Sequence, residues 1–332
     1  MPGIDPSFPR KIELARLPTP LQHLPRASER WGRGHRLWIK RDDLTGCTLS
    51  GNKVRKLEYI LAHARDNGFD TLITCGGLQS NHCRATAFAG AQLGIPVHLV
   101  LRGQPSGSSQ GNLLLDHLAG AVVSCYDTRE YIEGRDQLLA HWQQHYAEQG
   151  RNALVIPTGG SDGLGVWGYL EATRELDQDR AAAGIERAQV VCATGSGGTQ
   201  AGLTLGSALF GLPLDIWGVN VCDDAHYFHE KVAQDVGDWQ QRYGQQAPPL
   251  DVRVLDGYVG EGYAKASPEV FALIAELARL EGVLLDPVYT AKAFNGMVQE
   301  IEQGRFDGCR DIIFLHTGGI FGVFPQSDGF NL

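Results

Sequence analysis

Short apolar runs alternate with segments of helical periodicity along almost the whole chain. The apolar runs resemble buried strands and occupy residues 71–75, 96–101, 121–126, 154–157, 190–194, 214–221, 252–255, 283–286 and 311–316. Helical patterns separate the first of these runs, at residues 81–93, 111–119 and 129–149. This alternation predicts parallel β-sheets that are covered by helices on both faces.

Two turn-rich segments, residues 45–51 and 157–165, bracket one block of this pattern. We therefore predict an α/β protein with two doubly wound, mostly parallel open-sheet domains and a ligand site between them. The smaller domain comprises residues 51–160 and is inserted into a larger domain formed by residues 1–50 and 161–332. Ligands of such sheets bind beyond the carboxyl ends of the strands, so the loops that follow the strands are the places to search.

The segment LSGNKVRKLEYI, residues 49–60, places two of the chain's seven lysines at the start of an apolar helical pattern. Ser50 is a candidate N-cap, and the spacing puts Lys53 and Lys56 on one face of the first helical turn. The helix dipole disfavours cations at that end. The segment fits either a solvated basic patch or a lysine held near an anion or a carbonyl group, and by itself it leaves both interpretations open.

The strongest local signal is a glycine-rich turn between an apolar strand and a helix. It consists of Thr194, Gly195, Ser196, Gly197, Gly198 and Thr199. Backbone N–H groups in such a turn, together with the helix N-terminus, can bind an anion. Gln200 stands where the dinucleotide fingerprint has its third glycine, so a phosphate monoester fits better than a pyrophosphate. Asp223 follows the next strand, where a ribose ligand is expected, and keeps a nicotinamide-dependent dehydrogenase as an alternative.

A second loop, GGLQSNHCR, follows another apolar strand and opens a helix. Gln79, Ser80 and Asn81 present N–H groups and polar side chains at this helix start, and that arrangement suits a substrate carboxylate. A simple capped turn explains the same pattern equally well.

The composition argues against several functional classes. The net charge of −9 argues against a nucleic-acid partner, and no apolar run approaches the roughly 20 residues of a membrane span. His141 and His145 have helical spacing but no acidic ligand nearby, so no metal is expected. Scattered cysteines and an N-terminal segment without an apolar signal core predict a cytoplasmic protein with reduced thiols.

Several stretches together resemble one known family. They are PTPL, WIKRDDLTG, SGNKVRKLE, QSNHCRAT, GNLLLDHLAGA, VIPTGGS, GSGGTQAG, DPVYTAKA and HTGG. They resemble the pyridoxal 5'-phosphate enzymes that include D-cysteine desulfhydrase and 1-aminocyclopropane-1-carboxylate (ACC) deaminase, which have a tryptophan-synthase-β-like fold. The resemblance covers essentially the whole chain. It implies a small amino-acid substrate, a homodimer, and cofactor binding by the larger domain.

The resemblance also implies roles for residues around the cofactor. Lys53 is the residue that binds the cofactor aldehyde covalently, and once substrate replaces it the freed amine can take the proton from the substrate Cα. Lys56 and the glycine-rich turn of residues 194–199 are implied to bind the phosphate. Asn81 is implied to contact the phenolic oxygen of the cofactor, and Thr317 to face its pyridine nitrogen.

Further residues are implied on the substrate side. Gln79, Ser80 and Asn81 resemble the carboxylate-binding loop of the family. Tyr263 and Tyr289 resemble its active-site tyrosines, although a lone tyrosine after DPV is otherwise typical of a half-buried anchor. The catalytic candidates are Lys53, Ser80, Tyr263 and Tyr289.

Two positions bear on the reaction. Relatives of the ACC deaminase type carry Glu directly after the active-site Tyr and Leu before Gly-Gly, whereas this chain has Thr290 and Thr317. A threonine hydroxyl only hydrogen-bonds the ring nitrogen, so it leaves a weaker electron sink than a carboxylic acid does. Expulsion of hydrosulfide needs less carbanion stabilisation than opening of a cyclopropane ring. The resemblance thus implies β-elimination of D-cysteine, with elimination from cysteate or chloroalanine, or ACC deamination, as alternatives.

Overall fold

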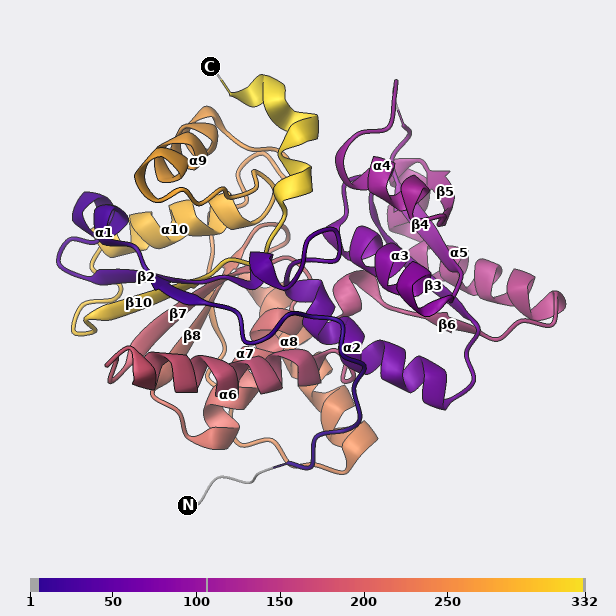
Figure 1. The fold of residues 1–332 in the computed structure, drawn as a ribbon, viewed down its shortest axis with the longest axis horizontal. Helices are drawn as coiled ribbons and strands as arrows, with labels where there is room; N and C mark the ends of the chain where they lie inside the picture. Colours follow the sequence, from indigo (N-terminus) through magenta and orange to yellow (C-terminus); the bar gives the residue numbers. More distant parts are fainter. Residues whose placement is uncertain (1–5, 106, 331–332) are drawn as a thin grey trace.

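The structure, a computed structural model, describes residues 6–105 and 107–330, and this part of the chain contains two separate β-sheets (Figure 1). The larger sheet has the order β1 (Leu21–His23), β2 (Arg36–Lys40), β10 (Asp311–Leu315), β7 (Ala188–Thr194), β8 (Leu214–Asn220) and β9 (Arg253–Leu255). Strand β1 pairs antiparallel with β2, and the other neighbours pair in parallel. The smaller sheet is parallel throughout, in the order β5 (Val122–Tyr126), β4 (Val97–Arg102), β3 (Thr71–Gly77) and β6 (Ala153–Val155). The predicted fold class is confirmed.

Helices cover the sheets. In chain order the described helices are α1 (Pro25–Trp31), α2 (Asn52–Asp66), α3 (Asn81–Leu93), α4 (Gly111–Leu118), α5 (Thr128–Glu148), α6 (Val166–Ala182), α7 (Gly198–Phe210), α8 (Ala225–Tyr243), α9 (Pro268–Glu281) and α10 (Thr290–Glu302). Short 3₁₀ turns are η1 (Asp42–Leu44), η2 (Thr158–Gly160), η3 (Ile320–Gly322) and η4 (Phe324–Gly329). Figure 1 shows α9 and α10 above the larger sheet and α6 below it. The helices predicted before residue 160 are confirmed as α3, α4 and α5.

Eight of the predicted strands are confirmed, and the one at residues 283–286 is wrong. Val283 and Leu285 are buried in a core cluster, so packing against neighbouring elements explains this apolar run without a strand. Strands β1 and β2 were not predicted. The first is short and mostly exposed, and Arg36 and Lys40 interrupt the apolar pattern at both ends of the second.

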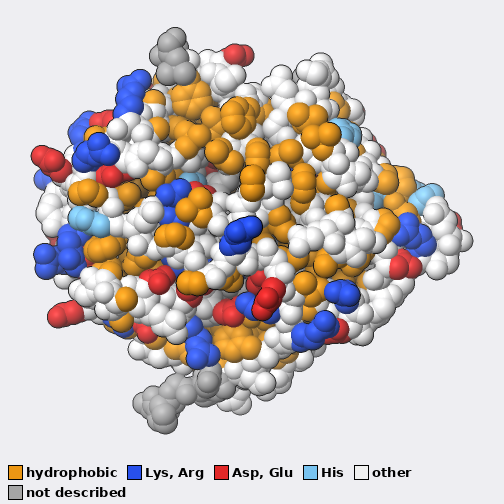
Figure 2. All heavy atoms as spheres, viewed as in Figure 1, with side chains coloured by type: hydrophobic (Ala, Val, Ile, Leu, Met, Phe, Trp, Pro, Cys, Tyr) orange, Lys and Arg blue, Asp and Glu red, His pale blue; other side chains and the backbone are white. Residues whose placement is uncertain are grey.

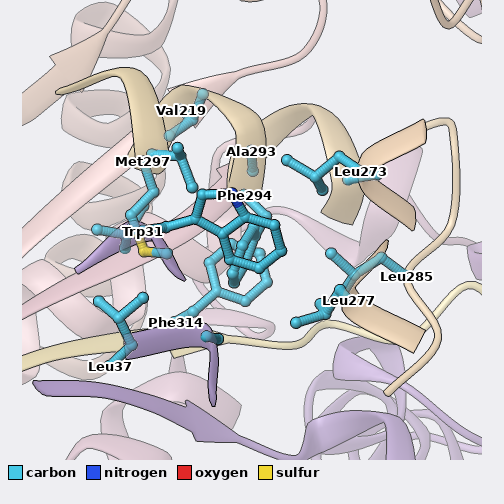
Figure 3. Packing of buried hydrophobic residues seen from close by; sticks show 14 of the residues in the cluster. Trp31, Leu37, Val219, Leu273, Leu277, Leu285, Ala293, Phe294, Met297 and Phe314 are labelled. Atoms are coloured by element: carbon cyan, nitrogen blue, oxygen red, sulfur yellow. The ribbon is translucent and has the colours of Figure 1, made fainter. Parts of the chain in front are cut away.

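A large hydrophobic cluster packs α10 onto the larger sheet (Figure 3). Trp31 of α1 contacts Phe294 edge-on with ring centroids 5.7 Å apart, and Phe294 contacts Phe314 of β10 at 5.1 Å. Ala293 and Met297 are also fully buried on this helix. Aromatic pairs in this geometry contribute about 0.5–1.5 kcal/mol each beyond their buried area. Because this packing fixes α10, it also fixes the residues at the N-terminus of the helix.

The start of α2 is held by two loops of the larger sheet. The prediction that Ser50 caps the helix is wrong, because Gly51 occupies the N-cap position and no side chain caps it. Gly51 has φ of +91°, a conformation that glycine adopts without strain. Its N–H donates to Thr45 Oγ1 (2.8 Å), and the Asn52 N–H donates to the Thr317 carbonyl oxygen (3.0 Å).

A buried ion-pair network anchors the middle of α2. Arg55 donates to both carboxylate oxygens of Asp42 (2.8 Å each) and to both of Glu175 (2.9 Å each). The Tyr169 hydroxyl donates to Asp42 (2.6 Å), and Lys40 pairs with Glu175 (2.5 Å). Burial alone would raise the pKa of Glu175, but Arg55 and Lys40 lower it to about 2. Helix α2 is therefore an internal element with buried charges, and a solvated basic face is wrong for it.

The predicted domain boundaries, after residues 50 and 160, fall between β2 and β3 and between β6 and β7. The division into these domains stays a prediction, and residues 1–5, 106 and 331–332 lie outside the described part of the chain.

Positive and negative side chains are interleaved on the face shown in Figure 2. In the described ranges no helix combines the length and apolarity needed to cross a bilayer. All seven cysteines are free thiols.

Candidate active site

A cavity of about 960 Å³ opens between the loops that follow the strands of the two sheets. Gly77 at the end of β3 and Pro157 after β6 line it from the smaller sheet, whereas Gly195 after β7 and Thr317 after β10 line it from the larger sheet. The strand order reverses between β3 and β6 and between β10 and β7. Doubly wound sheets bind ligands at such reversals. Both sheets therefore direct their ligand-binding edge into one cavity.

This cavity brings together most of the residues expected at the site. Its lining includes Lys53, Ser80, Asn81, Gly195, Ser196, Tyr263, Tyr289 and Thr317. The expected residues outside the lining are Lys56, Gln79, Thr194, Gly197, Gly198 and Thr199. The Gln79 side chain is turned toward α4, where Nε2 donates to the Gln110 carbonyl (3.0 Å) and Oε1 accepts from the Asn112 N–H (2.8 Å). Its assignment to the substrate stays a prediction without support from this orientation.

Lys53 points its amine at the glycine-rich turn. Its Nζ lies 3.5 Å from Ser196 Oγ, and a Cβ added to Gly159 would lie 3.1 Å from the same nitrogen. Burial lowers the pKa of Lys53 to about 8. A lysine with this pKa has an appreciable unprotonated fraction near neutral pH, and both a nucleophile and a proton acceptor need that form.

Lys56 and the glycine-rich turn both form hydrogen bonds with Ser161. Its Nζ donates to Ser161 Oγ (3.2 Å), which also accepts from the Gly198 N–H (3.2 Å) and donates to Ser196 Oγ (2.9 Å). Burial, and then the charge of Lys53, lower the pKa of Lys56. Two neighbouring cations that are partly or fully shielded from water destabilise each other's charged form, and a bound anion would relieve the repulsion.

The turn has the shape of an anion cradle. Gly197 has φ of +83°, and a Cβ added to Gly198 would lie 2.8 Å from Lys56 Nζ. Helix α7 begins at Gly198, so the first N–H groups of the helix are available to a ligand at the turn. Glycine backbone, the buried Lys56, the half-buried Lys53 and the Ser196 hydroxyl together fit a phosphate monoester.

The start of α3 offers donors to a carboxylate. Ser80 caps the helix, because its Oγ accepts from the Cys83 N–H (3.2 Å), and its hydroxyl hydrogen stays available to donate. Asn81 Oδ1 accepts from Asn112 Nδ2 (3.0 Å), which leaves the amide hydrogens of Asn81 for a ligand. Both residues line the cavity at a helix N-terminus, where the partial positive charge favours an anion.

Two phenols face the same cavity as a hydrogen-bonded pair. The hydroxyl oxygens of Tyr263 and Tyr289 are 2.5 Å apart, and the Arg102 guanidinium lies over the Tyr263 ring at 5.0 Å. Burial raises the pKa of Tyr289, and it raises the pKa of Tyr263 to about 12 against the effects of Tyr289 and Arg102. Both phenols are therefore protonated near neutral pH. One proton serves the hydrogen bond within the pair and the other is available to a ligand.

The two threonines that bear on the reaction lie in different places. Thr317 lines the cavity. Thr290 is fully buried and lies outside the lining, where its Oγ1 donates to Asp286 Oδ1 (2.7 Å). Of this pair, Thr317 is therefore the residue that can contact a bound ring directly.

The lining residues that sequence reasoning missed include Asn52, Ser161, Lys231 and His82. Ser161 had a signal, since it ends the TGGS stretch after β6. Lys231 had no recognisable sequence signal. It lies on α8, and its amine donates to the Ser161 carbonyl oxygen (3.0 Å). His82 Nδ1 is buried without a partner among the described residues, and burial together with the two lysine charges lowers the His82 pKa. A neutral imidazole thus lies beside the lysines.

A model of the pyridoxal-phosphate dependent enzymes matches residues 12–318. The chain belongs to this family. It is 40% identical over 329 residues to a D-cysteine desulfhydrase of Yersinia pestis (strain Pestoides F), with 96% of this chain and 97% of the relative covered. It is 40% identical over 323 residues to the mitochondrial bifunctional D-cysteine desulfhydrase/1-aminocyclopropane-1-carboxylate deaminase of Arabidopsis thaliana, with 93% and 79% covered. The solved structure of an ACC deaminase homologue has a TM-score of 0.84 and 34% identity, covering 96% of this chain and 94% of the other.

Family membership confirms pyridoxal phosphate as the cofactor and leaves the dehydrogenase alternative without support. Gln200 gives a physical reason. It is fully buried, accepts from Thr194 Oγ1 (2.9 Å) and donates to the Arg253 carbonyl (2.8 Å). Its side chain occupies space that a dinucleotide fingerprint leaves open with glycine for close helix–strand packing.

Lys56→Ala should weaken cofactor retention without abolishing the yellow absorbance of the bound cofactor. The substitution removes one positive charge that would bind the cofactor phosphate, while Lys53 stays in place. The loss should therefore be about 1–3 kcal/mol of cofactor binding, the scale of one charge-assisted hydrogen bond. Dialysis against phosphate followed by absorbance measures it. Lys265→Ala, at an exposed lysine, is the matched control. Equal retention in both variants would show that Lys56 does not bind the phosphate.

Proposed function

We propose that this protein catalyses the pyridoxal phosphate-dependent β-elimination of D-cysteine to pyruvate, ammonia and hydrogen sulfide. One observation carries the proposal. The half-buried Lys53, with a pKa of about 8, and the paired phenols of Tyr263 and Tyr289 line the same cavity. A β-elimination needs a base for the Cα proton and an acid for the leaving group. The name D-cysteine desulfhydrase, which the relative from Yersinia pestis carries and which is also part of the Arabidopsis relative's name, supports the choice of substrate.

Each residue of the lining has a distinct task in this proposal. The cofactor supplies the electron sink for the electron pair left at Cα. Lys53 holds the cofactor and then takes the Cα proton, while Ser80 and Asn81 orient the substrate carboxylate at the start of α3. The Tyr263–Tyr289 pair donates a proton to the departing sulfur. The Cα–H and Cβ–S bonds break, and water completes the balance to pyruvate and ammonia.

Thr317 favours expulsion of sulfur over opening of a cyclopropane ring. As the threonine that lines the cavity, it offers a neutral hydroxyl to the ring nitrogen and so supports a modest electron sink. Elimination from cysteate or a chloroalanine uses the same groups and stays an alternative. ACC deamination stays an alternative because the Arabidopsis relative is named for both activities.

The decisive experiment is an ammonia-release assay over D-cysteine, L-cysteine, D-cysteate, L-cysteate, β-chloro-D-alanine and ACC. We expect the highest kcat/KM with D-cysteine, together with pyruvate and hydrogen sulfide in equal amounts. Release of ammonia from ACC but not from D-cysteine would contradict the proposal.

The double variant Thr290→Glu with Thr317→Leu should raise kcat/KM for ACC relative to D-cysteine by about 10-fold or more, the range that altered pocket contacts give. The new carboxyl group would lie beside Asp286, whose Oδ1 is 2.7 Å from Thr290 Oγ1. A neighbouring carboxylate in a buried site favours the protonated form, and a carboxylic acid on a side chain longer than that of Thr290, extending toward the cavity, is the proton donor that a stronger sink requires. The ratio of kcat/KM for ACC to kcat/KM for D-cysteine is measured for the parent protein and for the double variant, each folded and cofactor-loaded. Thr317→Leu alone is the control. An unchanged ratio would show that pocket shape selects the substrate.

We also propose that the protein is a cytoplasmic homodimer. Support for the dimer comes from the resemblance to the family, and support for the compartment comes from seven free thiols, four of them fully buried or nearly so. Sedimentation of the purified holoenzyme measures the mass in solution, and a monomer at micromolar concentration would contradict the dimer.

A further inference from the structure

The DPVYTAKA segment contains a lysine, Lys292, that the proposed reaction does not use. It lies on α10, three residues after Tyr289, and is only 3% exposed. Its Nζ donates to the carbonyl oxygens of Val259 (2.8 Å) and Gly262 (2.8 Å). The hydrogen-bond partners of this buried amine are therefore backbone groups of a distant segment.

Both carbonyl groups belong to the irregular segment that joins β9 to α9, residues 256–267, which also carries Tyr263. The backbone of this segment turns sharply, with φ of +126° at Gly262 and +61° at Ala264. A non-glycine residue with positive φ is uncommon, and such conformations persist only where surrounding contacts hold them. Within the segment the Lys265 N–H donates to the Gly262 carbonyl oxygen (3.2 Å), so contacts from outside the segment act together with this turn in fixing where the Tyr263 hydroxyl lies.

The other member of the phenol pair lies on a fixed element. Tyr289 occupies the N-cap position of α10, and Phe294 and Met297 bury the same helix in the core (Figure 3). Lys292 thus extends from a rigid helix to the segment that carries the partner tyrosine. The peptide carbonyl that it binds, that of Gly262, directly precedes Tyr263.

We propose that Lys292 is a positioning residue, which clamps the 256–267 segment onto α10 and so sets the distance between the Tyr263 and Tyr289 hydroxyls. Its importance for turnover rests on the proposed function, in which this pair protonates the leaving sulfur. A methionine could fill the same buried space without the desolvation of an amine. The specific contribution of the amine is the pair of hydrogen bonds to the segment.

Amide hydrogen exchange tests the clamp without turnover. In the cofactor-loaded Lys292→Met variant, exchange in residues 256–267 should accelerate about 10-fold or more while α10 stays protected, because local opening exposes amides only where contacts are lost. Lys265→Met is the matched control, since Lys265 lies on the same segment and is exposed. Unchanged exchange in this segment of Lys292→Met would overturn the proposal. Lys292→Gln, too short to reach both carbonyl oxygens, replaces Lys292→Met if the latter does not fold.

Kinetics test the consequence for the tyrosine pair. Lys292→Met should lower kcat by on the order of 10- to 100-fold, the scale of a misplaced catalytic group, with cofactor absorbance unchanged. Adding Tyr263→Phe to Lys292→Met should then cost much less than Tyr263→Phe costs in the parent protein. Additive losses would overturn the positioning role, because they would show that Lys292 acts independently of Tyr263. If D-cysteine is not turned over at all, the proposed function fails, while the exchange experiment still decides the clamp.

Discussion

Lys53→Ala should lose the yellow absorbance of the covalently bound cofactor and at least about 10³-fold of its turnover, because in the proposed function covalent attachment and proton transfer use the same amine. The position of the amine supports this double role. It lies in the cavity wall 3.5 Å from Ser196 Oγ on the glycine-rich turn, and its pKa is lowered to about 8. Absorbance of the purified variant and kcat with D-cysteine measure the two effects.

Two comparisons make the Lys53 result interpretable. Lys56→Ala should keep the absorbance, since Lys56 contacts Ser161 behind the turn. Lys265→Ala should keep both absorbance and turnover, because Lys265 is exposed. A Lys53→Ala variant with the turnover of the parent protein would show that another group carries the chemistry.

Arg55→Met should lower the free energy of unfolding by about 3–5 kcal/mol, the usual loss when one partner of a buried ion pair is removed. The methionine keeps most of the side-chain volume but leaves the carboxylates of Asp42 and Glu175 without the guanidinium that bonds to both. Denaturant unfolding of the cofactor-loaded protein measures the shift in midpoint at constant slope. Arg65→Met, at an exposed arginine near the end of the same helix, should change stability by well under about 1 kcal/mol.

The ion pair of Arg55 with Glu175 predicts how the free energy of unfolding depends on pH. The folded-state pKa of Glu175 is lowered from its ordinary value of 4.5 to about 2. A carboxyl group with a lowered pKa contributes stability that is fully present above the unfolded pKa and is lost as the pH falls toward the folded pKa. The parent protein should therefore lose stability between about pH 4.5 and pH 2, and Arg55→Met should lose less over this interval. Equal slopes in the two proteins would contradict the assignment of the shift to Arg55.

The sequence by itself determined most of the elements, although not β1 and β2, and the chemistry that each loop offers. Alternation of apolar runs and helical patterns is a local property, and it predicted parallel sheets with α3, α4 and α5 close to their observed bounds. The glycine-rich turn and the two lysines of α2 were also recognisable locally, because residue type and spacing decide which groups a strand-to-helix turn presents. The strand predicted at residues 283–286 was wrong because an apolar run indicates burial. A buried segment is apolar whether or not it pairs in a sheet.

Only the tertiary structure decided which of these groups meet. Lys56 and Ser161 are 105 residues apart in sequence and share a hydrogen bond, and Lys292 reaches Val259 across 33 residues. Tertiary packing also turned Gln79 toward α4. Such contacts depend on the relative placement of packed elements, and no local periodicity encodes that placement. The same packing lowers the pKa of Lys53. This pKa shift arises from desolvation, which the side chain undergoes only when both sheets are assembled around the cavity.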